Sequence, residues 1–248
     1  MSKRIMKGRT LVIGDIHGGL LALKQVLERA EVTQKDKLIF LGDYVDGWSE
    51  SAGVIEMIMQ LEKKNECVFI IGNHDQWCLE WLLTNEMNET GYLHGGKATM
   101  QSYEGMSVSR KNKHLRFFRS MKRYVIDKQN RLFVHAGFAS MHGPHRDDAL
   151  TPLWDRTLWE MAVAMDRNLD HGSLFFPKRL KLYTEIYIGH TPTTNYGITV
   201  PMQVHTLWNT DTGAAFGDRL TILDVDSKKY WQSDPLNVLY PDEPGRKR

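Results

Sequence analysis

The chain has 248 residues, of which 42% are hydrophobic and 25% are charged, and its formal net charge is +2. This composition is typical of soluble globular proteins and excludes the disordered, collagen-like and membrane-spanning classes. Because the charges nearly balance, the chain has no overall field that attracts polyanions, and nucleic-acid binding would need a local basic patch. A single α/β domain often fills this length.

The amino terminus and the cysteines bear on where the protein resides. Residues Met1–Arg9 are polar and basic and contain no apolar region of the kind found in signal peptides. Only Cys67 and Cys78 occur, and two cysteines do not make the disulfide framework of a secreted protein. We therefore expect reduced thiols and a cytoplasmic protein, with a redox pair of these two cysteines as the alternative.

Three short apolar runs, each followed by a helical pattern, occupy the first third of the chain. The runs that predict buried strands are Thr10–Gly14, Lys37–Leu41 and Cys67–Ile71. Apolar residues then recur at helical spacing in residues 20–30, 53–63 and 76–83. This alternation of strands and helices predicts parallel pairing with right-handed crossovers.

The second half of the chain is less regular. Further strands are predicted at Arg131–Val134, Glu185–Ile188, Pro201–Leu207 and Arg219–Val225. No repeat or low-complexity linker divides the sequence, so we expect one domain over residues 1–248. We also expect a helical cap insertion at about 85–124, a loop-rich insertion at about 139–184 and a frayed tail at about 241–248.

Side chains that bind metals in proteins follow five of the predicted strands. In chain order they stand in the segments Gly14-Asp15-Ile16-His17-Gly18, Gly42-Asp43-Tyr44-Val45-Asp46-Gly47, Gly72-Asn73-His74-Asp75, His135-Ala136-Gly137 and Gly189-His190-Thr191-Pro192. In an open α/β sheet the carboxyl ends of parallel strands line one crevice. We therefore expect these five segments to converge on one site.

Six residues are candidate metal ligands: Asp15, His17, Asp43, Asn73, His135 and His190. Carboxylate and imidazole ligands without a thiolate suit manganese, iron or zinc, and we expect manganese. Six ligands are more than one ion takes from a protein while keeping an open position, so we predict two divalent ions with one carboxylate between them. Such a pair binds a phosphoryl group and lowers the pKa of a bound water.

His74 follows a candidate ligand in a turn, and we expect it to stay off the metals. If Asp46 holds one of its ring nitrogens, the other is free to protonate a leaving oxygen. Lys97 follows two glycines, and it is a candidate contact for a substrate phosphate.

The five segments resemble the motifs GDxHG, GDxxDRG, GNH[ED], HAG and GHT of the PPP family of calcineurin-like metallophosphoesterases. This family includes serine/threonine protein phosphatases, small bacterial protein phosphatases and symmetrical diadenosine tetraphosphatases. The resemblance extends over about residues 10–226. It implies an α/β fold of the α/β/β/α sandwich type, with mixed sheets and the active site at the carboxyl ends of the strands.

The resemblance also implies roles for the site residues. Asp15 and His17 would hold the first metal, Asp43 would bridge, and Asn73, His135 and His190 would hold the second. His74 with Asp46 matches the family's acid pair. Arg156, in the segment Leu153-Trp154-Asp155-Arg156, matches an arginine that binds the substrate phosphate, to which Asn73 would add a contact.

One position departs from the family pattern. Gly47 stands where GDxxDRG has its arginine, and that arginine would normally bind the substrate phosphate. Three explanations stay open: another basic residue such as Lys97, Arg110 or Arg146 substitutes, the substrate carries less charge at phosphorus, or turnover is weak.

From this resemblance we expect a phosphoesterase in which a metal-bridging hydroxide attacks phosphorus. A bacterial serine/threonine protein phosphatase, with tyrosine as a further substrate, is the first choice. The alternatives are a symmetrical bis(5'-nucleosyl)-tetraphosphatase or other nucleotide or diester hydrolase, and a pseudo-phosphatase that only binds a phosphorylated ligand. The expected partners are a phosphorylated protein, a peptide or a nucleotide, with no nucleic acid and no membrane.

Two weaker patterns complete the sequence. Residues 110–123 carry seven Lys and Arg residues and no acid, which predicts an amphipathic helix with a solvated basic face. A basic rim that attracts phosphates is the alternative. Trp77 and Trp81 are four residues apart, and we expect both to pack in the core rather than stack on a base.

Overall fold

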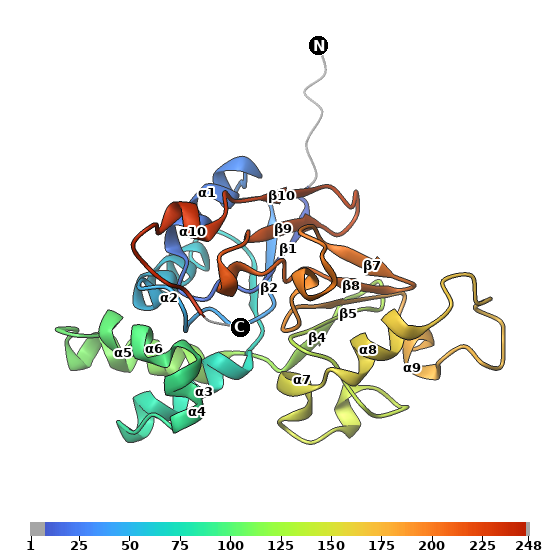
Figure 1. Ribbon diagram of the computed structural model, residues 1–248, viewed down its shortest axis with the longest axis horizontal. Coiled ribbons are helices and arrows are strands. Elements are labelled where there is room, and N and C mark those ends of the chain that lie inside the picture. The colour runs from blue at the N-terminus through green and yellow to red at the C-terminus, as the bar shows by residue number, and fades with distance from the viewer. Residues whose placement is uncertain (1–7, 247–248) are drawn as a thin grey trace, which may run out of the picture.

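Two five-stranded sheets form the centre of the computed structural model, which describes residues 8–246 (Figure 1). The first sheet consists of β1 (Thr10–Ile13), β2 (Lys37–Phe40), β3 (Cys67–Phe69), β9 (Thr221–Asp224) and β10 (Tyr230–Gln232). The second consists of β4 (Tyr124–Ile126), β5 (Arg131–Val134), β6 (Glu185–Ile188), β7 (Met202–Val204) and β8 (Leu207–Asn209). Residues 1–7 of the polar amino terminus and residues 247–248 of the predicted tail lie outside the described residues.

Strand pairing follows the pattern predicted from the sequence in the first third of the chain. β1 pairs with β2, and β2 with β3, in parallel, so that Val12 lies opposite Ile39. β9 and β10 add antiparallel strands to this sheet. In the second sheet β5, β6 and β8 are parallel, whereas β4 and β7 are antiparallel. Both sheets are therefore mixed, as predicted.

The alternation of side chains along each strand places the sheets face to face. Leu11 and Ile13 of β1 pack in one core with helices α1 (Leu20–Arg29) and α2 (Ser51–Leu61). Val12, between them, packs in a separate core that also contains residues of the second sheet. In that core the rings of Phe133 and Tyr187 stack with their centres 5.0 Å apart. The first sheet thus has helices on one face and the second sheet on the other.

The second sheet is covered in the same way. Leu132 and Val134 of β5 pack with Leu158 and Trp159 of α8 (Thr157–Ala164), and α9 (Lys178–Lys181) contributes Leu180. The order of layers is helix, sheet, sheet, helix, which is the sandwich that the sequence predicts.

The predicted helical insertion contains α4 (Glu89–Gly91), a bent helical segment (Tyr92–Gly96), α5 (Lys97–Ser102) and α6 (Val108–Ser120). These follow α3 (Asn73–Thr84), and Phe117 of α6 packs edge-on against Phe69 of β3 at 4.8 Å. The loop-rich insertion contains α7 (Thr151–Trp154) together with α8 and α9. Figure 1 shows α3 to α6 and α7 to α9 as two groups on either side of the middle of the molecule.

Some elements differ from those predicted from the sequence. The single strand expected at Pro201–Leu207 is a hairpin of β7 and β8, because His205 takes a left-handed φ of +53° between them. β4 and β10 were not predicted, since each is a three-residue, partly exposed edge strand. The tail that we expect to fray from about residue 241 follows α10 (Leu236–Leu239). It is held in place by hydrogen bonds of Glu243 to Ser49 and of Arg246 to Ala215.

Two observations bear on the surroundings of the protein. Cys67, which is partly buried, and Cys78, which is buried, are both free thiols. Within residues 8–246, no helix has the length and apolar character needed to cross a membrane.

Candidate active site

The six candidate ligands come together where the two sheets meet. Each follows the carboxyl end of a strand or begins the helix after it, and each is less than 10% exposed. We call this set the ligand cluster: Asp15, His17, Asp43, Asn73, His135 and His190. β1, β2 and β3 of the first sheet and β5 and β6 of the second supply it, so the convergence involves both layers rather than one open sheet.

Tight turns aim these side chains inward. His17, Asp43 and His190 have left-handed φ angles of +52°, +51° and +68°, a region that residues other than glycine rarely adopt. Such strain, typically of order 1–3 kcal/mol per residue, persists where the surrounding structure requires it and is concentrated at functional sites.

Asp43 lies at the centre of the ligand cluster. Its Oδ2 atom is 3.6 Å from His17 Nε2 and 3.4 Å from His135 Nε2. Among residues 8–246, two groups have the spacing needed to hold a metal ion: His17, Asp43 and His74, and Asp43, His135 and His190. Because both groups share Asp43, an ion in each group would have this carboxylate as a common ligand.

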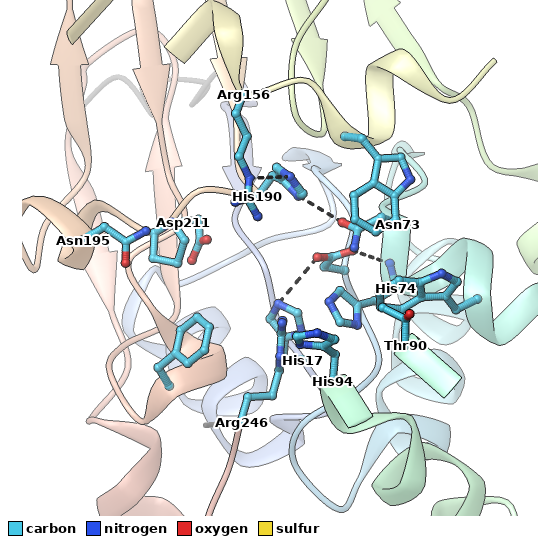
Figure 2. Close-up of a pocket in the computed structure, with 15 residues that line it drawn as sticks. His17, Asn73, His74, Thr90, His94, Arg156, His190, Asn195, Asp211 and Arg246 are labelled. Atoms are coloured by element: carbon cyan, nitrogen blue, oxygen red, sulfur yellow. Dashed lines mark hydrogen bonds and ion pairs between the residues drawn. The ribbon is translucent and has the colours of Figure 1, made fainter. Parts of the chain in front are cut away.

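Asn73 joins the second of these groups. Its Oδ1 atom lies 3.1 Å from His135 Nε2 and 3.0 Å from His190 Nδ1. Figure 2 shows Asn73 beside His190. The amide oxygen therefore faces the same point as the two imidazoles, as a metal ligand would.

Hydrogen bonds to the backbone orient two of the imidazoles. His17 Nδ1 lies 2.8 Å from the carbonyl oxygen of Asp46, and His135 Nδ1 lies 2.8 Å from that of Leu41. Since a carbonyl only accepts, each Nδ1 carries the proton when the ring is neutral. The lone pair of Nε2 then points toward Asp43, which is the arrangement found in histidines that bind metals.

A buried carboxylate oxygen without a partner provides an independent test of the metal prediction. Asp15 Oδ2 accepts a bond from His190 N at 2.9 Å, but Oδ1 is buried without a hydrogen-bond partner. Burial and the charge of Asp211 raise the pKa of Asp15 well above its ordinary value, and burial raises that of Asp211 to about 6. Bound cations would relieve this repulsion, so the residues fit divalent metals.

The Asp43 carboxylate also concentrates negative charge at the site, and its effect is seen on His135. Burial by itself lowers the pKa of His135, but the Asp43 carboxylate outweighs it and raises that pKa to about 10. The Asp43 carboxylate thus favours a positive charge beside it, as a bound cation would also provide.

His74 and Asp46 form the pair that the sequence predicts. His74 Nδ1 is 2.8 Å from Asp46 Oδ2, and Thr99 Oγ1 donates to Asp46 Oδ1 at 2.6 Å. Burial lowers the pKa of His74 to about 3 and raises that of Asp46 to about 7. The other ring nitrogen of His74 is left to face the cavity, close enough to His17 and Asp43 to bind a metal as well as a substrate oxygen.

The predicted phosphate-binding residues differ in their placement. Arg156 lines the cavity above the ligand cluster, and its Nε donates to His190 Nε2 at 3.3 Å. Lys97 is exposed and lines a neighbouring hollow instead. Arg110 forms an ion pair with Glu56, and Arg146 is exposed in its loop. Of these basic residues, the structure brings only Arg156 into the cavity.

The cavity over the ligand cluster has a volume of about 380 Å³. Its remaining lining contains residues to which the sequence assigns no role at the site: Trp77, His94, Trp154, Asp211, Phe216 and Arg246. Trp81 packs in the core as expected, but Trp77 lines the cavity. None of residues 110–123 lines it, so the basic stretch does not form its rim.

The fold and this site define a metal-binding hydrolase of phosphoric esters. The chain matches the calcineurin-like phosphoesterase family over residues 8–221, and it belongs to that family. It is 27% identical over 229 residues to the asymmetrical bis(5'-nucleosyl)-tetraphosphatase PrpE of Bacillus cereus strain 03BB102, covering 86% of this chain and 88% of that protein.

Solved structures share the fold. A protein described as a candidate diadenosine tetraphosphatase superimposes with a TM-score of 0.65 at 16% identity, over 94% of this chain and 96% of that one. A serine/threonine phosphatase from Saccharomyces cerevisiae superimposes with a TM-score of 0.59 at 14% identity, over 94% and 81%. These similarities establish the architecture.

Proposed function

We propose that this chain hydrolyses dinucleoside tetraphosphates, such as diadenosine tetraphosphate, with two divalent metal ions. The observation that carries the proposal is a set of aromatic side chains in the cavity, Trp77, His94 and Trp154, which we call the aromatic wall. The relatives named as tetraphosphatases support the same class of substrate.

The aromatic wall offers surfaces on which a base can stack. The rings of Trp77 and Trp154 are 5.3 Å apart, and Trp77 stacks with His94 at 6.3 Å. Trp77 also contacts His74 edge-on at 4.8 Å, so the wall adjoins the site of chemistry. Stacking on an aromatic side chain contributes about 1–3 kcal/mol per base. A phosphopeptide has no base to use this surface.

The ligand cluster would hold the two ions. Asp15 and His17 would bind one, Asn73, His135 and His190 would bind the other, and Asp43 would contact both. The absence of thiolates favours manganese, with iron or zinc as alternatives. When bound, two such ions lower the pKa of a water molecule and bind the phosphoryl oxygens.

In this proposal, His74 protonates the leaving oxygen. Burial opposes the charged ring, whereas the Asp43 carboxylate favours it, and a negatively charged substrate would favour it further. Asp46 fixes the ring orientation, because it binds Nδ1 and is itself held by Thr99. Arg156, on the side of His190, would bind a phosphoryl oxygen.

The comparisons favour this nucleotide alternative over the protein phosphatase that is the first choice from the sequence. The yeast phosphatase shares only the fold, at 14% identity. The sequence alternative is a symmetrical tetraphosphatase, whereas the relatives are named asymmetrical. Because the relatives are named asymmetrical, we expect a nucleoside monophosphate and a nucleoside triphosphate as products. A cytoplasmic location remains part of the proposal.

The test is a comparison of kcat/KM values for the manganese-loaded protein. Diadenosine tetraphosphate, a phosphoserine peptide and a phosphotyrosine peptide are assayed in parallel, with the nucleotide products separated by chromatography. We expect the dinucleotide to be cleaved at least tenfold more efficiently than either peptide, into AMP and ATP. Efficient peptide turnover with an idle dinucleotide would reject the proposal, and two ADP molecules would reject the asymmetrical cleavage.

A further inference from the structure

Space beside Gly47 is occupied by a residue from the other end of the chain. Gly47 has a φ of +130°, and a Cβ atom added to it would lie 3.4 Å from Cγ of Arg246 and 3.2 Å from the carbonyl oxygen of His17. The stem of Arg246 therefore runs along the position at which a side chain of residue 47 would begin.

Three contacts fix the segment that carries Arg246. The Glu243 carboxylate accepts bonds from Ser49 N at 2.9 Å and Ser49 Oγ at 2.6 Å. Gly245, at a φ of +59°, lies so close to Trp48 that a Cβ atom would be 2.8 Å from the indole ring. Arg246 N then donates to the carbonyl oxygen of Ala215 at 2.9 Å. We call residues 241–246 the carboxy-terminal strap.

The strap directs the guanidinium of Arg246 into the cavity. Figure 2 shows Arg246 beside His17 and His94, on the opposite side of the ligand cluster from Arg156. Both arginines line the cavity. The guanidinium carbon of Arg246 lies 5.2 Å from the centre of the Phe216 ring, which supports it from one side.

No acid of the described residues forms an ion pair with the Arg246 guanidinium. Within residues 8–246, its Nε is buried without a hydrogen-bond partner. Burial lowers the pKa of Arg246, whereas the charges of Asp43, Asp46 and Asp211 raise it from a distance. If metal ions neutralised the carboxylates of the site, a partly buried cation that lines the open cavity would remain. An anion in the cavity would satisfy its N–H donors.

We propose that Arg246 binds the phosphoryl group of the substrate across the cavity from Arg156. It thereby supplies, from the carboxy-terminal strap, the cationic contact that Gly47 does not. The inference rests on the proposed function only in requiring a phosphate in the cavity, which nucleotides and phosphopeptides share. A fork of N–H donors matches two phosphoryl oxygens, so charge and geometry both suit this ligand.

The test measures the binding of inorganic phosphate to the manganese-loaded protein by calorimetry. Arg246→Met keeps the aliphatic stem against Gly47 and Phe216 but removes the guanidinium. We expect the Kd for phosphate to rise about 10- to 100-fold, since a charge-assisted bond contributes roughly 1.5–3 kcal/mol. Arg246→Lys should recover part of the affinity. Arg146→Met, at an exposed arginine outside the cavity, should leave the Kd unchanged.

Two results would overturn the inference. One is a phosphate Kd for Arg246→Met within twofold of the wild type. The other is a loss of affinity that accompanies an equal loss of bound manganese or a lower melting temperature, because the role would then be structural. If the phosphate effect appears but diadenosine tetraphosphate is not cleaved, the proposed function fails while the role of Arg246 stands.

Discussion

The floor and the rim of the cavity are built differently. The floor is the ligand cluster, whose residues follow strands directly, are buried, and are held by short bonds such as that of His135 to Leu41. The rim consists of the aromatic wall with Arg156, Phe216 and Arg246, which come from helices, insertions and the strap. Trp154 is 41% exposed, whereas His135 is fully buried. From this difference we propose that the floor determines the chemistry and the rim determines the substrate.

The largest effect should come from the centre of the floor. Asp43→Asn removes the charge shared by both candidate ion positions, and we expect kcat/KM to fall by at least about 10³-fold with loss of bound manganese, because the ions provide several kcal/mol of transition-state stabilisation. Metal content and initial rates test this. Asp242→Asn, at an exposed acid of the strap, is the matched control. Full activity in Asp43→Asn would break the distinction between floor and rim.

The acid predicted at the edge of the floor should come next. His74→Asn should lower turnover about 10²–10⁴-fold on a substrate with a poor leaving group. We expect the protein to retain two ions per chain, since His74 acts on the leaving oxygen in this account. A variant that loses one ion would instead make His74 a ligand, as its spacing from His17 and Asp43 allows. Unchanged turnover would exclude the acid role.

A change in the rim should affect binding and spare the chemistry. Trp77→Ala should raise KM for diadenosine tetraphosphate about tenfold, because it removes a surface on which a base stacks. It should leave the rate on a small phosphate ester without a base nearly unchanged. Phe175→Ala, at an aromatic residue that is 87% exposed, is the control. Equal losses on both substrates would show that Trp77 supports His74 rather than a base.

The smallest expected effect is on stability. Two buried acids, Asp46 and Asp36, should make the stability depend on pH in opposite directions. Asp46, which contacts His74 beside the floor, has its pKa raised by burial to about 7. Without metal, the folded state therefore loses stability as the pH rises from about 4 to 7. Burial also opposes ionisation of Asp36, but hydrogen bonds from Arg9 and Thr33 outweigh it and lower the pKa of Asp36 to about 2. The folded state therefore loses stability as the pH falls below about 4.

Melting temperatures of the metal-free protein from pH 3 to 8 test this contrast. Asp46→Asn should flatten the decline between pH 4 and 7, and Asp36→Asn should flatten the decline below pH 4. If Asp46→Asn melts with the pH dependence of the wild type, its carboxyl does not carry the raised pKa.

The floor could be predicted from the sequence because its signal is local. Each ligand stands next to an apolar run that forms a strand over nearly the predicted residues, as in β5 and β6. Strand periodicity and the direction of parallel strands are then enough to bring the ligands together. Short edge strands such as β4 and β10 lack this signal, because their side chains are partly exposed and show no alternation.

The rim could not be predicted because its contacts are made across the fold. Trp77 and Trp81 have the same helical spacing, and only the packing of the insertion shows that Trp77 lines the cavity. Residues 241–248 are rich in charge and proline, a composition typical of a frayed end. The approach of Gly245 to Trp48, which holds Arg246 in place, leaves no pattern in the sequence.

The most direct test of the account is an anomalous difference map from a crystal soaked in manganese. We expect two peaks about 3.5–4 Å apart, one on either side of Asp43 Oδ2. One peak should lie toward His17 and the other toward His135. A single peak, or two peaks that do not share Asp43, would contradict it.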